Sequence, residues 1–165
     1  MNIPYDVLGR SLSGCPFFPK DVYSYLKDFK NLCLIKHLSS FNDFDDGFKM
    51  YMFDFINDDA SMIKRYSDSI MIYGGKVKDD YDLLLALVYG FDGVLLDLKS
   101  YHLSKQARRF GLSVVFVVEN KLDLIKASFY KADIFYVLND LFFSIPKEKV
   151  IISKINHERI KGLIV

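Results

Sequence analysis

Hydrophobic positions along this chain fall into runs of two alternating kinds. One kind is short and largely apolar on consecutive positions, as in "SIMIY" (69–73) and in the stretch from Val94 to Leu98. A strand that is buried on both faces, as in a parallel sheet, has this pattern. The other kind mixes apolar and polar residues, as in "DDASMIKRYS" (58–67), and is typical of a helix with one buried face. The alternation predicts consecutive βα units.

The stretch from 79 to 101 shows one such unit most clearly. Aspartates at positions 79, 80 and 82 precede an apolar run over 83–88, and carboxylates in a first helical turn are stabilised by the positive end of the helix dipole. Gly90 then supplies the left-handed residue that commonly ends a helix. The consecutive apolar run that follows predicts a buried strand.

The same order recurs along the chain. Strand starts near Gly93, Ser113 and Asp133 are spaced by 20 residues, as in a tight βα repeat. Expected helices lie at 19–29, 58–67, 83–88, 102–111 and 120–131, the last with Asn120 as its N-cap. Eight strands are expected, at 31–38, 49–56, 69–73, 94–98, 112–119, 132–139, 149–155 and 161–165.

Eight alternating units predict one domain over 1–165, a (βα)8 TIM-type barrel of the α/β class. The chain has 165 residues, whereas such barrels typically need about 250. The short linkers 39–48, 140–146 and 156–159 therefore predict a trimmed barrel with several helices shortened or missing. The alternative is an open parallel α/β sheet, which fits the length better but has about five strands.

Composition narrows the function classes. The chain is 51% apolar and 26% charged, with a net charge of +1, so charge gives no argument for binding nucleic acid or membrane. The sequence shows no signal peptide and no apolar run of transmembrane length, and we expect a cytoplasmic protein. Cys15 and Cys33 could form one disulfide, but we expect two reduced thiols. No metal site and no cofactor are expected, because the three histidines are scattered.

Two stretches resemble a known family. "GGKVKDDYDLLLALVYGFDGVLL" (74–96) resembles the "KDFIIDxYQIYEARxxGADAVLL" stretch of indole-3-glycerol phosphate synthase, a barrel enzyme of tryptophan biosynthesis. "FGLSVVFVVENKLDLIKASFYKADIFYVLNDL" (110–141) follows the family's next pattern in order. The resemblance is good over 79–139 and looser over 30–165. It implies a lyase that closes an indole ring with loss of carbon dioxide and water.

The resemblance implies a lysine acid and carboxylates as catalytic groups. Lys36 matches the lysine of the family's first motif, but Leu34 stands where the family has Glu. The family's expected acid falls on Gly74, and its later Glu falls on Val117. Lysine and glutamate both follow two residues further on, and the candidate catalytic residues are therefore Lys36, Lys76 and Glu119.

Substrate-binding positions carry over in part. Ser39 matches the first serine of the family's "SPS", Asn139 remains from its Asn pair, and Ser153 remains from its "SES". The family's phosphate-binding Gly-Ser after strand eight has no counterpart before Val165. We therefore expect no tight binding of phosphorylated sugars at this end of the barrel.

Several candidates also have a purely structural interpretation. Lys36 is either a catalytic cation or a rim lysine, and strand alternation predicts that His37 points the other way. "YGGK" (73–76) is either a phosphate cradle or, as we expect, a plain turn. Glu119 with Asn120 fits a helix cap as well as an acid. "NDFDDGF" (42–48) fits a solvated turn better than a calcium loop, because it lacks the closing Glu.

Two functions remain. The chain is predicted to be a degenerate, synthase-like barrel that is not an active synthase and serves as a structural or protein-interaction component. The Phe pairs of "CPFFP" (15–19) and "DLFFSIP" (140–146) would suit a protein partner. The alternative is an active or repurposed lyase of the tryptophan pathway that acts on a small phosphorylated molecule. An open, polar barrel mouth would favour the enzyme, and a mouth filled by side chains would favour the interaction component.

Overall fold

The fold is a closed barrel of eight parallel strands. The computed structural model describes Pro4 and residues 17–165, so Cys15 lies outside the described residues. Each strand pairs with the next, and β8 pairs with β1. The strands are β1 (Cys33–Leu38), β2 (Met50–Phe53), β3 (Ile70–Tyr73), β4 (Gly93–Leu96), β5 (Ser113–Val118), β6 (Ile134–Val137), β7 (Val150–Ser153) and β8 (Gly162–Ile164). The predicted barrel is confirmed, and the alternative of an open sheet is wrong.

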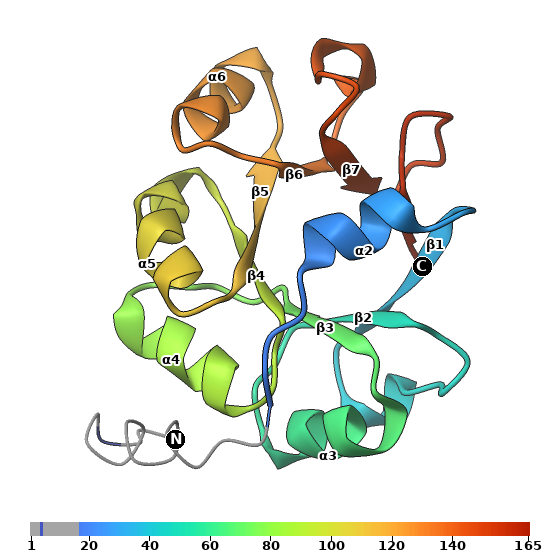
Figure 1. Cartoon of the computed structure of the whole chain (residues 1–165), viewed down its shortest axis with the longest axis vertical. Helices are drawn as coiled ribbons and strands as arrows, with labels where there is room; N and C mark the ends of the chain where they lie inside the picture. The colour runs from blue at the N-terminus through green and yellow to red at the C-terminus, as the bar shows by residue number, and fades with distance from the viewer. Residues whose placement is uncertain (1–3, 5–16) are drawn as a thin grey trace.

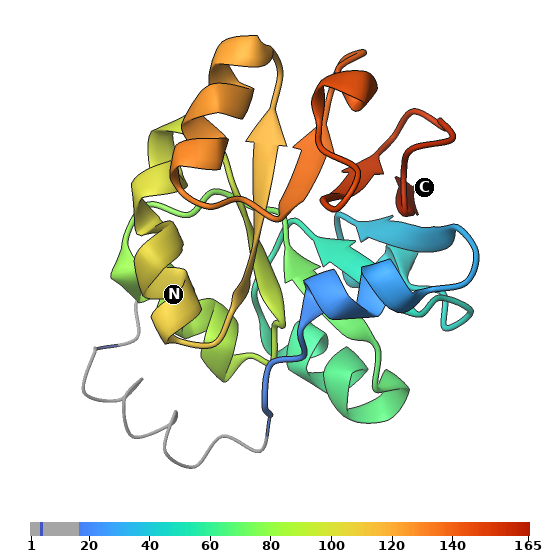
Figure 2. The same cartoon turned by 45° about the horizontal axis from the view of Figure 1, so that its top comes forward.

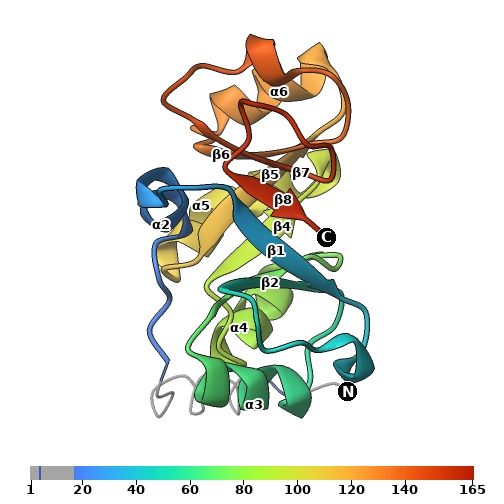
Figure 3. The same ribbon diagram turned by 90° about the vertical axis from the view of Figure 1, so that its right-hand side faces the viewer.

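Helices cover the outside of the barrel unevenly (Figures 1 and 2). The connections from β2 to β6 contain α3 (Asp58–Ser67), α4 (Asp80–Val88), η2 (Leu98–Leu103) with α5 (Ser104–Arg109), and α6 (Lys121–Phe129). Only short 3₁₀ turns follow β1 and β6, namely η1 (Phe41–Asp43) and η3 (Phe142–Ser144). The connection from β7 to β8 has no helix. In Figure 3, β8 and β1 face the viewer with no described helix in front of them.

The helices α3, α4 and α6 begin where a polar side chain satisfies the first free amides. Asn57, Asp79 and Asn120 each accept a hydrogen bond from a backbone N–H of the first turn, at 3.0, 3.2 and 2.9 Å. Such N-caps stabilise a helix by about 1 kcal/mol. The predicted cap at Asn120 is thereby confirmed.

The helices α4, α5 and α6 end at residues with left-handed backbone. Gly90 (φ 95°) follows α4 and Gly111 (φ 84°) follows α5, as the sequence predicts for Gly90. At the same point after α6 the chain has Lys131, with φ 60°. A side chain in this conformation costs free energy that glycine avoids.

A short helix fills the N-terminal end of the barrel. Val22 and Leu26 of α2 (Val22–Asp28) are 0% exposed and pack with the side chains that point inward from the strands. The Val22 N–H donates to Ser113 Oγ at 3.0 Å, and the Lys20 N–H donates to Asp92 Oδ1 at 2.8 Å. Figure 1 shows α2 lying across the middle of the barrel. Ligand access is therefore left to the opposite, C-terminal end, here called the mouth.

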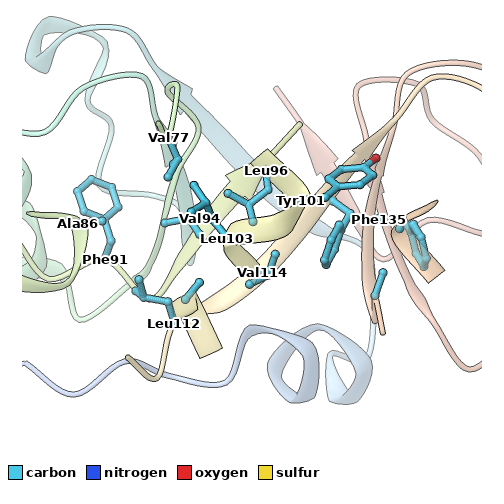
Figure 4. Close-up of a cluster of buried hydrophobic side chains, with 14 of the residues drawn as sticks. Val77, Ala86, Phe91, Val94, Leu96, Tyr101, Leu103, Leu112, Val114 and Phe135 are labelled. Carbon is cyan, nitrogen blue, oxygen red and sulfur yellow. The ribbon is translucent and has the colours of Figure 1, made fainter. Parts of the chain in front are cut away.

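A second core lies between the strands and the outer helices (Figure 4). Its aromatic rings meet edge to face: Phe53 and Phe91 have centroids 5.3 Å apart, and Tyr101 and Phe116 have centroids 5.1 Å apart. Such pairs add to the hydrophobic stabilisation of buried rings. No helix among the described residues has the length and apolar character needed to cross a membrane.

Candidate functional site at the barrel mouth

Polar residues follow the buried strands at the mouth. Leu95 and Val117 pack against the inner core, so the alternation of the strands carries Asp97 and Glu119, two residues later, to the mouth. Functional groups of (βα)8 enzymes lie at this end because the loops there are free of the core.

A cavity of about 620 Å³ opens at the ends of β3, β4 and β5. Its size is within the range of small-molecule sites. The cavity is lined by Gly74, Gly75, Lys76, Val77, Leu95, Asp97, Leu98, Lys99, Ser100, Val117, Glu119, Asn120 and Asp123.

Two of the three candidate catalytic residues meet in this cavity. Lys76 comes from the loop after β3 and Glu119 from the end of β5, and both are exposed to solvent. Asp97, at the end of β4, adds a carboxylate that was not among the candidates. An ammonium and two carboxylates can transfer protons to and from a ligand bound between them.

Hydrogen bonds hold the cavity wall in place. Asp123 is 7% exposed and accepts the Glu119 N–H at 3.0 Å. Ser100 Oγ donates to Asp97 Oδ1 at 2.9 Å. The Tyr101 hydroxyl donates to the Val117 carbonyl, and burial raises the pKa of Tyr101, with a further contribution from nearby carboxylates. Tyr101 therefore stays a neutral donor, and it is a structural group rather than a base.

A second polar cluster lies at the ends of β1 and β2. His37 Nε2 is 2.7 Å from Asp54 Oδ1, and Ser39 Oγ donates to Asp54 Oδ2 at 3.0 Å. Ser39 is thus at the mouth, as the resemblance implies, but it does not line the cavity. The carboxylate stands between serine and histidine, so the serine hydroxyl adjoins Asp54 and not the imidazole. The order differs from a catalytic triad, in which histidine is the middle group.

Lys36, the third candidate catalytic residue, does not line the cavity. Ile35 belongs to the inner core, so the neighbouring Lys36 points to the outside of the barrel, where its ammonium lies 5.9 Å from the centre of the Phe48 ring. His37, which was expected to point away from the mouth, instead reaches it. The inner position of Ile35 fixes both directions, because successive strand residues alternate.

Asn139 and Ser153 are engaged in holding the loops. Asn139 Nδ2 donates to the Glu119 carbonyl at 2.6 Å, which ties the loop after β6 to the cavity rim. Ser153 is 0% exposed, and its hydroxyl donates to the Val137 carbonyl at 2.8 Å and accepts the Ile155 N–H at 3.1 Å. Neither residue lines the cavity.

The "YGGK" segment is a crowded turn. A Cβ atom at Gly74 would lie 2.9 Å from the Met52 Cγ, and one at Gly75 would lie 2.3 Å from the Tyr73 hydroxyl. The Gly74 N–H already donates to the Phe53 carbonyl at 2.7 Å. That amide cannot also bind a phosphate, so the geometry fits the plain turn.

The aspartates of "NDFDDGF" serve the local backbone. Asp43 Oδ2 accepts the N–H groups of Ser39 and Ser40, each at 3.1 Å, and Asp45 Oδ1 accepts the Gly47 N–H at 3.1 Å. In the described part of the chain, no group of three or more His, Cys, Asp or Glu side chains is arranged to hold a metal ion.

Sequence comparison decides the family. The chain is 31% identical over 200 residues to the indole-3-glycerol phosphate synthase of Campylobacter jejuni subsp. jejuni serotype O:23/36 (strain 81-176), across 93% of this chain and 78% of that protein. The chain belongs to the indole-3-glycerol phosphate synthase family. The synthase of Campylobacter jejuni subsp. doylei is 31% identical across 97% of this chain and 76% of its own length. That of Campylobacter hominis is 28% identical across 92% and 76%.

The other comparisons concern the fold. A search with family models finds no match. A solved structure titled "Native KDPGal structure" superposes with a TM-score of 0.63 at 13% identity, covering 83% of this chain and 84% of that one. At this identity the likeness shows a shared barrel fold alone.

In this member of the synthase family, three mouth residues were missed by sequence reasoning: His37, Asp54 and Asp97. Asp54 and Asp97 share a signal that could have identified them, since each is the first polar residue after a buried strand. Glu119 is also the first polar residue after a buried strand, and it was among the predicted candidates. His37 could not be placed without knowing which residues of β1 point inward.

Proposed function

We propose that this family member binds a small polar molecule in the mouth cavity and acts on it by acid–base chemistry, without closing the indole ring at the rate of its relatives. The observation that carries the proposal is the open cavity of about 620 Å³, which contains Lys76, Glu119 and Asp97. Side chains do not fill this part of the mouth, and an open polar mouth favours a small-molecule site over a purely structural barrel.

The two charged residues would divide the chemistry between them. The Lys76 ammonium is the proton donor to a departing oxygen, and the Glu119 carboxylate is the proton acceptor. Asp97 accepts a hydrogen bond from a ligand hydroxyl or amine. The lining has more carboxylates than ammonium groups, so we expect a ligand with hydrogen-bond donors rather than several negative charges.

The reduced synthase activity follows from where these groups lie along the chain. The resemblance places the family's lysine and glutamate at Gly74 and Val117, whereas the charges here come two residues later, on Lys76 in the loop after β3 and on Glu119 at the end of β5. Two residues of fully extended chain span about 6.6 Å. A displacement of 1 Å at a catalytic group can lower a rate by about 10²-fold. We infer a trimmed and repurposed barrel. Its acid–base pair, Lys76 and Glu119, lies closer to solvent than the catalytic groups that the resemblance implies.

Nuclear magnetic resonance with indole-3-glycerol phosphate as the probe tests this site. We expect millimolar binding, with shifted amide signals at Gly75, Lys76 and Glu119. Lys76→Met and Glu119→Gln should weaken the binding, and Lys36→Met, on the outer face of the barrel, is the matched control. Absence of shifts around the cavity at saturating probe would overturn the proposal.

The second candidate function is that of an interaction component that binds a protein partner. Exposed aromatic rings support it. Phe143 is 70% exposed and Phe18 is 85% exposed, whereas Phe142 is buried and stacks on His157 at 4.2 Å. A photo-crosslinking residue at position 143, with position 99 as control, should give one discrete adduct in cells if this candidate is right. Adducts equal at both positions would exclude it.

A further inference from the structure

Two grooves flank one exposed ring on the outside of the barrel. The larger, of about 550 Å³, is lined by Ser104, Lys105, Arg108, Arg109, Phe129, Tyr130 and Lys131. The smaller, of about 340 Å³, is lined by Leu98, Tyr101, His102, Lys126, Phe129 and Tyr130. Phe129 belongs to both grooves and is 82% exposed. Figure 1 shows α5 and α6 side by side on the outside of the barrel.

The exposed ring ends an apolar stripe along α6. Leu122, Ile125 and Phe129 are 58%, 67% and 82% exposed, at the i, i+3, i+7 spacing of one helix face. The opposite face of α6 is buried against the barrel through Leu124 and Ala127. A helix that is apolar on both faces has a solvent-facing stripe that folding of the barrel does not use.

Positive charge is concentrated around this stripe. The two grooves include five cationic side chains, Lys105, Arg108, Arg109, Lys126 and Lys131, and no Asp or Glu among the described residues lines either groove. The whole chain has 22 basic and 21 acidic residues, so charge is segregated here. The resulting potential favours an acidic partner.

The backbone at one of these cations is strained. Lys131 has φ 60° at the position where Gly111 ends the preceding helix with φ 84°. Glycine there would relieve the strain and remove the ammonium from the groove. Strain of this kind persists where the side chain has a use, so it motivates a functional interpretation.

Two further side chains, Arg108 and Ser104, line the larger groove. Arg108 donates to the carbonyls of Tyr130 and Lys131 at 2.8 and 3.0 Å, which holds α5 against the end of α6 and fixes the groove between them. Ser104 is 1% exposed and lines the same groove, and its hydroxyl has no hydrogen-bond partner among the described residues. A buried hydroxyl without a partner is a rare feature that a bound acceptor would satisfy.

We propose that the α5–α6 surface docks an acidic segment of a partner protein that carries apolar side chains. Carboxylates of the partner pair with Lys105, Arg109 and Lys131, and its apolar side chains cover Phe129 and Ile125. A second copy of this chain is disfavoured, because a symmetric contact would bring like charges together. A membrane surface is disfavoured, because the cations lie around concave grooves.

The test measures fluorescence anisotropy with a labelled amphipathic peptide that has Leu on one helical face and Glu on the other. The full chain should bind it, and Phe129→Ser and the pair Lys105→Glu/Arg109→Glu should each weaken binding at least about tenfold. Raising the salt to about 0.5 M should also weaken it. The same peptide with Lys in place of Glu should not bind.

The variant Lys131→Gly distinguishes an effect on peptide binding from an effect on stability. It should weaken peptide binding and raise the melting temperature, since it removes a cation and relieves strain. Asp68→Gly is the matched control: Asp68 has φ 46° at the end of α3, outside both grooves, so its binding should equal that of the wild type. Failure of the peptide to bind, or binding unaffected by the groove variants, would overturn the proposal. Binding to anionic vesicles instead, or self-association lost in Phe129→Ser, would overturn it in favour of a membrane or a second copy.

Discussion

The carboxylates of this chain perform different tasks according to their burial. Asp92 is 0% exposed and accepts hydrogen bonds from the Lys64 ammonium at 2.6 Å and from the Met71 N–H at 2.8 Å. Asp54 is partly exposed and links His37 to Ser39 at the mouth. Glu119 is exposed beside a cavity, where its carboxylate can meet a ligand. Burial thus separates a structural acid from the candidate functional ones.

Replacing Asp92 by Ala should destabilise the fold by about 3–5 kcal/mol, because a buried ammonium would lose its partner. The free energy of unfolding in urea measures this. Asp68→Ala, which removes the exposed partner of Lys20 at 3.0 Å, should cost far less, because solvent screens an exposed ion pair. Equal losses in the two variants would contradict the assignment of Asp92 as a structural acid.

Cys33 should make the fold sensitive to alkali. Burial raises the pKa of its thiol to about 11, above the value of about 8.5 in an unfolded chain. The folded state therefore disfavours the thiolate, and its contribution to stability is complete below the unfolded pKa and is lost as pH rises toward the folded pKa.

Urea unfolding of the wild type and of Cys33→Ala at several pH values measures this effect. Between about pH 8.5 and 11 the wild type should lose about 1–2 kcal/mol more than the variant. The other titratable groups are present in both proteins, so the difference between the two curves reports Cys33 and its coupling to Tyr25, whose pKa is raised by burial and by Cys33. Parallel curves would contradict the prediction.

At the scale of elements, the C-terminal end of each helix sets where the loop to the next strand begins. Gly90 and Gly111 end α4 and α5 in left-handed conformation, and each is followed by an apolar residue and, within three residues, by the next strand. The next unit, α6 followed by β6, has the same left-handed helix end, but the residue there is Lys131. The fold thus imposes the same helix end even where the residue is unfavourable.

Lys131→Gly should stabilise the protein by about 0.5–1 kcal/mol, because glycine adopts the left-handed conformation without a Cβ clash. Thermal and urea unfolding measure the change. Lys126→Gly, inside α6, should instead destabilise by about 1 kcal/mol. A loss of stability in Lys131→Gly would show that its side chain makes a contact that outweighs the strain.

At the scale of the whole molecule, the two ends of the barrel differ in kind. The N-terminal end is filled by α2, with Val22 and Leu26 fully buried. The mouth keeps a polar cavity over β3, β4 and β5, while Ser39 and His37 form a separate cluster at the ends of β1 and β2. A ligand would therefore bind on one side of the mouth.

The purified protein should form indole-3-glycerol phosphate at least about 10⁴-fold more slowly than its relatives. Leu34, Gly74 and Val117 stand where the resemblance implies Glu, Lys and Glu, and the loss of one positioned acid or base typically costs 10²–10⁴-fold. A direct assay of ring closure measures the rate, with a relative's synthase as the positive control. Growth of a tryptophan auxotroph on this gene at ordinary expression would contradict the prediction.

Phosphorylated sugars should bind no more tightly than about 1 mM. The cavity has no arginine among its described lining residues, and Asp97, Glu119 and Asp123 outnumber its two lysines. The Gly74 amide and the Ser153 hydroxyl are already hydrogen-bonded. Calorimetric titration with a ribulose-phosphate analogue measures the affinity. Micromolar binding that disappears in Ser153→Ala would show that a phosphate site survives.

The sequence alone determined the number and order of the strands. Consecutive apolar runs marked all eight strands, and Asn120 and Gly90 marked a helix start and a helix end, because local backbone chemistry decides caps and breaks. The order of motifs identified the family. Of the candidate residues that the sequence offered, Lys76 and Glu119 line one cavity.

Only the tertiary structure decided which side chains of a strand face the mouth. Strand alternation fixes that Lys36 and His37 point in opposite directions, but either could be the inner one until Ile35 packs in the barrel core. Ser153 likewise reads as a ligand-binding serine until the pairing of β6 with β7 brings its hydroxyl to the Val137 carbonyl. Both outcomes depend on contacts between residues far apart in the chain, and a local pattern does not contain them.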